Sequence, residues 1–349
     1  MFDGVSFDLI GSIQEDRVTC VIGFEGRIFR FALGFLGPGI FCCWKQVPMF
    51  HTLLPKVIAA SLGVLVWLMP LGHWLEAAVA SLTPFELGVG ALEQGQYERA
   101  ATVFTAVIEQ QPTAAAYANR CLANLQMNQY LAAIADCTQA LEIDTAAAEP
   151  LLNRGLAHYR QGSFETALSD FSDFLRRQPN DYRGFYNRGL VRMAEKDFPA
   201  ALGDFDRALA TASAAATTHS NSLAALYNDR GLTLLLIDRP DAAIDDFGHA
   251  IALNPADARA YFNRACACHY LGQETAALTN FDQVLALDPG HSHTYLKRGL
   301  IRQNMGDRMG AIADLQTAAY HAQKQGAVSL HRYVLNLLND LQSPVSVVG

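Results

Sequence analysis

Most of the chain repeats one pattern of apolar, small and polar positions. From Ser81 onward, apolar residues recur at the three- and four-residue spacing of amphipathic helices. Most units carry Arg near their start, and the steps between successive arginines are 34, 34, 42, 34 and 34 residues for Arg120, Arg154, Arg188, Arg230, Arg264 and Arg298. A regular period of this length predicts a helical solenoid, whose units bury their apolar faces against their neighbours.

Seven units share small and aromatic residues at fixed positions. They begin at Ser81, Ala114, Ala148, Tyr182, Ala224, Ala258 and Ser292. When each unit is numbered from its first residue, position 20 is always Ala, at Ala100, Ala133, Ala167, Ala201, Ala243, Ala277 and Ala311. Position 8 is small, position 24 is usually aromatic, and Pro often stands at position 32. Small residues let two helices approach, the ring fills the space between them, and Pro ends the second helix.

On these positions, residues 81–325 resemble the tetratricopeptide repeat (TPR) proteins. The resemblance implies an all-α fold, a right-handed superhelix of antiparallel helix pairs that we call helix A and helix B. It also implies that the A helices line a concave face that binds other proteins. The departures from the family pattern are local, because Cys137 and Leu315 replace the aromatic residue at position 24, and Thr145 and Gln323 replace Pro at position 32.

In five units, an Arg at position 7 is followed by an Asp at position 23. The pairs are Arg120–Asp136, Arg154–Asp170, Arg188–Asp204, Arg230–Asp246 and Arg298–Asp314. Arg264 is instead followed by Asn280, and the first unit has Leu87 and Val103 in place of both groups. This joint loss favours a structural ion pair between helix A and helix B over a site for a charged ligand, because either group alone would be left uncompensated.

Asn recurs beside this Arg, at position 6. The row consists of Asn119, Asn153, Asn187 and Asn263, with Asn228 one place off. It resembles the asparagine ladder in the TPR arm of O-linked N-acetylglucosamine transferase. Because a side-chain amide both donates and accepts hydrogen bonds, it can pair with the backbone of a bound peptide. The alternative is that these residues hydrate the surface or bond to a neighbouring helix.

The sequence also tests one specific class of partner. TPR proteins that bind the C-terminal tails of heat-shock chaperones share a clamp of Lys, Asn and Arg residues spread over three repeats. The first two units place Phe85, Val89, Ala118 and Leu122 at clamp positions, although Arg183 follows at a suitable place. No three consecutive units supply the full set, so heat-shock chaperone tails are not expected partners.

Two segments depart from the period. Residues 209–223 lengthen the step after the fourth unit and are rich in Ala, Ser and Thr. They predict an extended helix B with a loop, and a contact to a partner is the alternative. After Gly326, an apolar stripe predicts a capping helix over residues 326–341, which a solenoid needs to cover its last unit, followed by a tail at 342–349.

The first 80 residues do not follow the repeat. Residues 57–75 are uncharged and just long enough to span a bilayer. Together with Ala78-Val79-Ala80, they also match a cleaved secretory signal that would start near Met49. Residues 49–80 are therefore interpreted as a signal peptide or a transmembrane anchor, with neither as the third alternative.

Residues 1–48 are interpreted as an uncertain leader, either an atypical one or a product of a mis-assigned start. Lys45 and Lys56 lie on the upstream side of the apolar segment. By the positive-inside rule, they favour a repeat region outside the membrane. The sequence thus predicts an extracytoplasmic location, secreted or anchored, over a cytoplasmic one.

Composition narrows the chemistry further. The net charge is −8 and no basic patch is present, which disfavours nucleic acid as a partner. No phosphate loop, zinc-protease motif, nucleophile elbow or paired acidic motif occurs, so no enzyme activity and no cofactor are predicted. Cys266, Cys268, His269 and His293 do not converge at helical spacing, so no metal site is predicted.

Cys121 and Cys137 stand at positions 8 and 24 of one unit, where the two helices touch. Small core residues are the favoured interpretation, and a disulfide is the alternative if the protein is exported. The chain as a whole is interpreted as a non-enzymatic scaffold, exported or membrane-tethered, that binds peptide or helical segments of other proteins on its concave face. The alternatives are a recruiting subunit for a catalytic partner chain and a purely structural role.

Overall fold

The computed structural model describes residues 13–14, 17–24, 27–34, 82–214 and 220–342. The chain divides into two compact units, Met1–Val79 and Ala80–Gly349. In the first unit, three strands form an antiparallel sheet in the order β1-β2-β3, with β1 at Ile13–Gln14, β2 at Arg17–Phe24 and β3 at Arg27–Gly34. These strands lie outside residues 81–325, for which the all-α fold is expected.

The physical reason for the sheet is visible in the sequence. β2 and β3 are rich in β-branched and aromatic residues, which favour strands, and only Glu25-Gly26 separates them. This spacing is typical of a hairpin. The two strands pair along their whole length, from Arg17 opposite Gly34 to Phe24 opposite Arg27.

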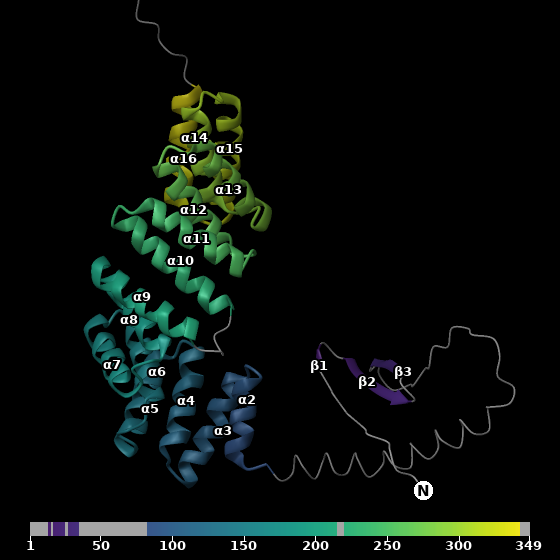
Figure 1. The fold of residues 1–349 in the computed structure, drawn as a ribbon, viewed down its shortest axis with the longest axis vertical. Coiled ribbons are helices and arrows are strands. Elements are labelled where there is room, and N and C mark those ends of the chain that lie inside the picture. Colours follow the sequence, from purple (N-terminus) through teal and green to yellow (C-terminus); the bar gives the residue numbers. More distant parts are fainter. Residues whose placement is uncertain (1–12, 15–16, 25–26, 35–81, 215–219, 343–349) are drawn as a thin grey trace, which may run out of the picture. The chain divides into compact units, whose positions relative to one another are not determined.

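In the described part of the second unit, fifteen helices form seven successive pairs and one final helix (Figure 1). The A helices are α2 (Pro84–Glu93), α4 (Ala114–Gln126), α6 (Glu149–Arg160), α8 (Tyr182–Ala194), α10 (Ser220–Leu236), α12 (Ala258–Tyr270) and α14 (Ser292–Asn304). The B helices are α3 (Tyr97–Gln110), α5 (Tyr130–Ile143), α7 (Phe164–Arg177), α9 (Phe198–Ala214), α11 (Pro240–Leu253), α13 (Glu274–Leu287) and α15 (Arg308–Lys324). We number these pairs repeat one to repeat seven, and the predicted solenoid of helix pairs is confirmed for this unit.

In every repeat, a residue with positive φ follows two positions after the last residue of helix A. In repeats one, three, six and seven this residue is glycine, as at Gly162, where φ is 78°. Repeats two, four and five use Asn128, Lys196 and Asp238, with φ between 58° and 64°. The left-handed conformation turns the chain back toward helix B, and it costs a residue with a Cβ more than it costs glycine.

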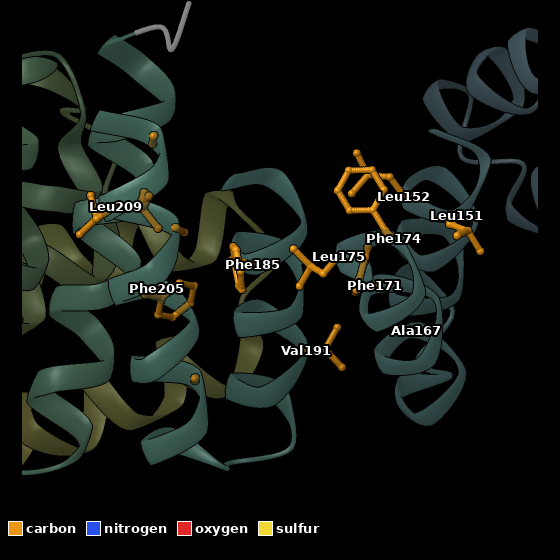
Figure 2. Packing of buried hydrophobic residues seen from close by; sticks show 14 residues of the cluster. Leu151, Leu152, Ala167, Phe171, Phe174, Leu175, Phe185, Val191, Phe205 and Leu209 are labelled. Carbon is orange, nitrogen blue, oxygen red and sulfur yellow. The ribbon is translucent and has the colours of Figure 1, made fainter. Parts of the chain in front are cut away.

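The core lies between helix A and helix B of each pair and between successive pairs. All seven alanines at position 20 are fully buried. In repeat four, a Cβ added to Gly189 would lie 2.7 Å from the ring of Phe205, so only glycine fits against that ring without a shift. Figure 2 shows how Phe171, Phe174, Phe185 and Phe205 fill the space between neighbouring helices. Each buried ring contributes about 1.5–3 kcal/mol through removal of apolar surface from water.

In repeat two, Cys121 of α4 and Cys137 of α5 are joined by a disulfide, with their Cα atoms 5.4 Å apart. The favoured interpretation of unbonded small core residues is therefore wrong. The two positions are those at which small and aromatic residues pack across the pair in most other repeats. A covalent bond thus takes the place of a packing contact.

α16 (Val328–Gln342) follows repeat seven and packs against α15. Val334 and Leu338 of α16 are buried against Leu315, Ala318 and Ala319 of α15. The last repeat therefore does not present these apolar side chains to solvent.

Among the described residues, no helix has the length and apolar character to cross a membrane. The apolar segment 57–75 and the Ala78-Val79-Ala80 sequence lie outside the described residues, as does the tail from residue 343 onward. The hypotheses of a signal peptide and of an anchor therefore stay predictions.

Candidate functional site

The structure brings each of the five predicted Arg–Asp pairs together. In every pair, Nε and Nη2 of the Arg donate to the two carboxylate oxygens of the Asp over 2.6–2.9 Å. The five aspartates are only 2–5% exposed. Such two-point bonds between a buried carboxylate and a planar guanidinium fix the geometry of helix A against helix B.

Each of these arginines also reaches the preceding repeat. The remaining nitrogen, Nη1, donates to position 25 of the helix B before it, at Thr105, Thr138, Ser172, Asp206 and Asp282. The Arg therefore links three helices. This contact between repeats was not predicted, although hydroxyl and carboxylate residues recur at position 25 of the repeat.

The five predicted asparagines fall into two groups. Asn119 donates to the carbonyl of Ala115 over 3.0 Å. Asn263 donates to Oδ1 of Asn228 over 3.0 Å, and Asn228 is 3% exposed. In contrast, the side chains of Asn153 and Asn187 have no hydrogen-bond partner among the described residues. Of the five, only these two amides make no hydrogen bond to another described residue.

Asn153 and Asn187 line one groove between α6, α8 and α10, with a volume of about 460 Å³. Its lining residues are Leu152, Asn153, Leu156, Tyr182, Arg183, Tyr186, Asn187, Asn221, Ser222 and Ala225. The groove thus combines aliphatic and aromatic surface with neutral amides, which suits a segment of polypeptide.

The insertion after repeat four contributes to this groove. Helix α10 begins at Ser220, four residues before the start predicted from the period, and Asn221 and Ser222 of its first turn line the groove. The predicted extension of helix B is also present, since α9 continues to Ala214. A contact to a partner, the alternative role that the sequence left open for the insertion, stays a prediction.

Charged groups around the groove are paired within the protein. Arg183 Nη2 lies 2.6 Å from both Glu149 Oε1 and Asp181 Oδ2, and the hydrogen bonds to Asp181 are the main reason that its pKa is raised. Tyr186 donates from its hydroxyl to Asp229 Oδ2 over 2.7 Å, across from α8 to α10. Burial raises the pKa of both of these groups. The amides of Asn153 and Asn187, which line the groove without a hydrogen-bond partner in the described part of the chain, are therefore neutral groups among paired charges.

A second cavity, of about 320 Å³, lies between α9, α10 and α11. Its charged lining includes Arg230, Asp206 and Asp246, which already bind one another over 2.6–2.8 Å. Leu202 and Leu234 supply its apolar surface. Arg239 and Asp245 also line this cavity, and a lining this rich in charge suits a neutral segment of polypeptide less well than the groove does.

The remaining chemistry-bearing residues of the repeats are weak candidates for a reactive site. Cys266 and Cys268 are free, and burial raises the pKa of both thiols, which disfavours the reactive thiolate. His269 Nδ1 lies 2.8 Å from Glu274 Oε2. Among the described residues, no group of three or more His, Cys, Asp or Glu side chains is arranged to hold a metal ion.

Two family models, both described as tetratricopeptide repeat, match the chain. One matches residues 85–148 and 152–227, and the other matches residues 258–291. No curated protein matches the chain.

Solved structures share the fold. A tetratricopeptide repeat protein from Parabacteroides merdae is 20% identical, with a TM-score of 0.54 over 72% of this chain and 97% of that one. A chain of the APC/C hetero-tetramer Cut9–Hcn1 is 16% identical, with a TM-score of 0.56 over 71% of this chain and 48% of that one. The C-terminal part of a TPR repeat-containing protein from Cytophaga hutchinsonii is 14% identical, with a TM-score of 0.53 over 70% of this chain and 98% of that one. At these identities the likeness concerns the fold alone.

Proposed function

The chain belongs to the tetratricopeptide repeat family, and from that premise we propose that it is a non-enzymatic scaffold that binds an extended segment of another protein in the groove between α6, α8 and α10. One observation carries the proposal. Asn153 and Asn187 lie in this groove with unused amides, whereas Asn119, Asn228 and Asn263 are hydrogen-bonded within the protein.

The chemistry of the groove supports this choice of ligand. An Asn side chain can accept from a peptide N–H and donate to a peptide carbonyl, so two of them recognise backbone whatever the side chains are. Leu152, Leu156 and Tyr186 supply apolar surface for those side chains. The Tyr186–Asp229 hydrogen bond holds the wall of the groove in place before a ligand arrives, which reduces the entropy lost on binding.

Proximity labelling in cells tests the proposal. The wild type is compared with an Asn153→Ala/Asn187→Ala variant and with a matched control, Asn119→Ala/Asn263→Ala, in which the substituted amides are already bonded internally. We expect the first variant to lose specific partners at unchanged melting temperature and the control to keep them. An unchanged partner set in the first variant would contradict the proposal. Co-purification of a catalytic chain would favour the alternative, a recruiting subunit.

We further propose that the repeat region works outside the cytoplasm. Two features support this: the uncharged segment 57–75 and the Cys121–Cys137 disulfide, since disulfides persist mainly in oxidising compartments. Intact-mass measurement of the native protein with thiol alkylation tests the idea. A disulfide-bonded chain that begins at Ser81, or a membrane-bound chain that retains residues 57–75, is expected. A soluble, full-length chain with both thiols alkylated would contradict it.

A further inference from the structure

Repeat six lacks the acid that completes the Arg link in the other repeats. Its Arg264 donates from Nε to Asn280 Oδ1 over 2.8 Å, as its counterparts donate to Asp. Asn280 has no second oxygen, and its amide nitrogen donates to the carbonyl of Ala276. The contact to the preceding repeat is also missing, because position 25 there is Gly248.

The guanidinium of Arg264 is nevertheless held in the usual place. Its carbon lies 5.7 Å from the centroid of the Tyr261 ring, three residues earlier in the helix. The corresponding distances in four other repeats are 5.5–5.8 Å. The ring and the Nε bond therefore orient the group, while Nη1 and Nη2 have no hydrogen-bond partner among the described residues.

Space for a ligand lies beside Gly248. A Cβ built on this glycine meets no atom within 4 Å. The neighbouring repeats show which group belongs there, because Asp206 binds Arg230 Nη1 over 2.8 Å and Asp282 binds Arg298 Nη1 over 2.6 Å from the same position. Beside Arg264, open space therefore occupies the place that Asp206 takes beside Arg230 and Asp282 takes beside Arg298. The Nη1 and Nη2 groups of Arg264 face this place without a partner among the described residues.

We propose that Arg264 binds an external oxyanion, a carboxylate or phosphate group, in the space beside Gly248. The ligand would receive charge-assisted hydrogen bonds from Nη1 and Nη2, as Asp206 and Asp282 receive one each from their arginines. This site is separate from the groove between α6, α8 and α10, so it adds a second point of attachment for a partner or a site for a small anion. It does not depend on the proposed function of the groove.

The test uses the full-length chain and titrates sodium phosphate and sodium acetate separately, at constant ionic strength kept with sodium chloride. The melting temperature is followed in the wild type and in two variants, Asn280→Asp and Gly248→Asp, which each supply an internal carboxylate. We expect at least one anion to stabilise the wild type and both variants to bind it about tenfold more weakly. A Gly248→Ala variant, which adds no charge and whose Cβ meets no atom within 4 Å, should keep the response.

The outcomes separate the sources of the anion. Stabilisation by phosphate alone indicates a phosphorylated ligand or free phosphate, and stabilisation by acetate as well indicates an acidic side chain of a partner. The proposal is overturned if neither anion acts beyond chloride, or if the two variants respond as strongly as the wild type.

Discussion

Repeat four and repeat six have the same backbone plan but differ in how helix A is tied to helix B. In repeat four, Asp204 accepts from both Arg188 and Arg192, and Arg188 also reaches Ser172 of the preceding repeat. In repeat six, the corresponding Arg264 makes one hydrogen bond, to a neutral amide. Both repeats keep the packed interface, with the position-24 rings of Phe205 and Phe281 no more than 1% exposed.

This comparison shows that packing and the ion pair can be separated. Repeat six keeps its helix pair with apolar packing and one hydrogen bond, so the charged link is not required to form the pair. A buried carboxylate is costly unless it is paired, and two arginines around Asp204 therefore make repeat four dependent on that one residue. Repeat six has no acid at this position, so its helix pair does not depend on one. Its Arg264 therefore keeps two nitrogens, Nη1 and Nη2, that bond to no described residue.

The strongest test of the comparison removes the acid from repeat four. Asp204→Ala leaves Arg188 and Arg192 without their common acceptor, and we expect the free energy of unfolding to fall by about 3–5 kcal/mol. Asn280→Ala, the matched change in repeat six, should cost about 1 kcal/mol. Thermal unfolding checks both values. Equal losses would show that the two repeats are tied in the same way. Arg188→Ala should also destabilise the protein.

Repeat two offers a third kind of link and the next largest effect. Cys121 and Cys137 are 16 residues apart in sequence, and closing a loop of this size is worth about 3 kcal/mol. A thiol reductant should therefore lower the melting temperature of the wild type. A Cys121→Ala/Cys137→Ala variant should melt lower and show no further response. Insensitivity of the wild type would argue against a structural disulfide.

A smaller effect is expected from exchanging the packing residue. Repeat six has Ala265 where repeat four has Gly189, and a Cβ at Gly189 would lie 2.7 Å from Phe205. Gly189→Ala should destabilise by about 1–2 kcal/mol, because the clash outweighs the better helix propensity of Ala. Chemical denaturation measures the change. A stabilised variant would mean that the Phe205 ring shifts at little cost to make room for the added Cβ.

The smallest effect comes from the turn between helix A and helix B. Repeat six uses Gly272, whereas repeat four holds Lys196 at a φ of 64°. Lys196→Gly should stabilise the protein by about 0.5–1 kcal/mol, because glycine adopts this conformation without strain from a Cβ. The melting temperature should rise, with Gly272→Lys as the reverse control. If Lys196→Gly lowers it, side-chain contacts of Lys196 outweigh the backbone strain.

The sequence predicted those features that repeat at a fixed spacing. Arg188 and Asp204 could be paired because the same sixteen-residue separation recurs in five units, and Ala167 at position 20 marked a close approach of two helices for the same reason. The Tyr186–Asp229 bond could not be predicted, because it joins residues 43 apart across the insertion, where the period fails. The places of Asn221 and Ser222 in the groove depend in the same way on how α10 stacks after that insertion.

The Asn row shows the limit most clearly. Position 6 and the neighbouring Asn228 gave five candidates of equal standing, since a sequence pattern places residues on one face but does not tell which amides a neighbour will use. Asn263 bonds to Asn228, whereas Asn153 and Asn187 find no partner in the described part of the chain. Their distinction depends on the residues of adjacent helices, which differ from repeat to repeat.

Site-specific photo-crosslinking tests the central claim most directly. A photoreactive residue is placed at Leu156 in the groove and, for comparison, at Leu202 in the charged cavity between α9, α10 and α11. The account predicts a crosslinked partner protein from position 156 that disappears in the Asn153→Ala/Asn187→Ala background and no such partner from position 202. The same partner captured from both positions, or captured from position 156 regardless of the two asparagines, would contradict it.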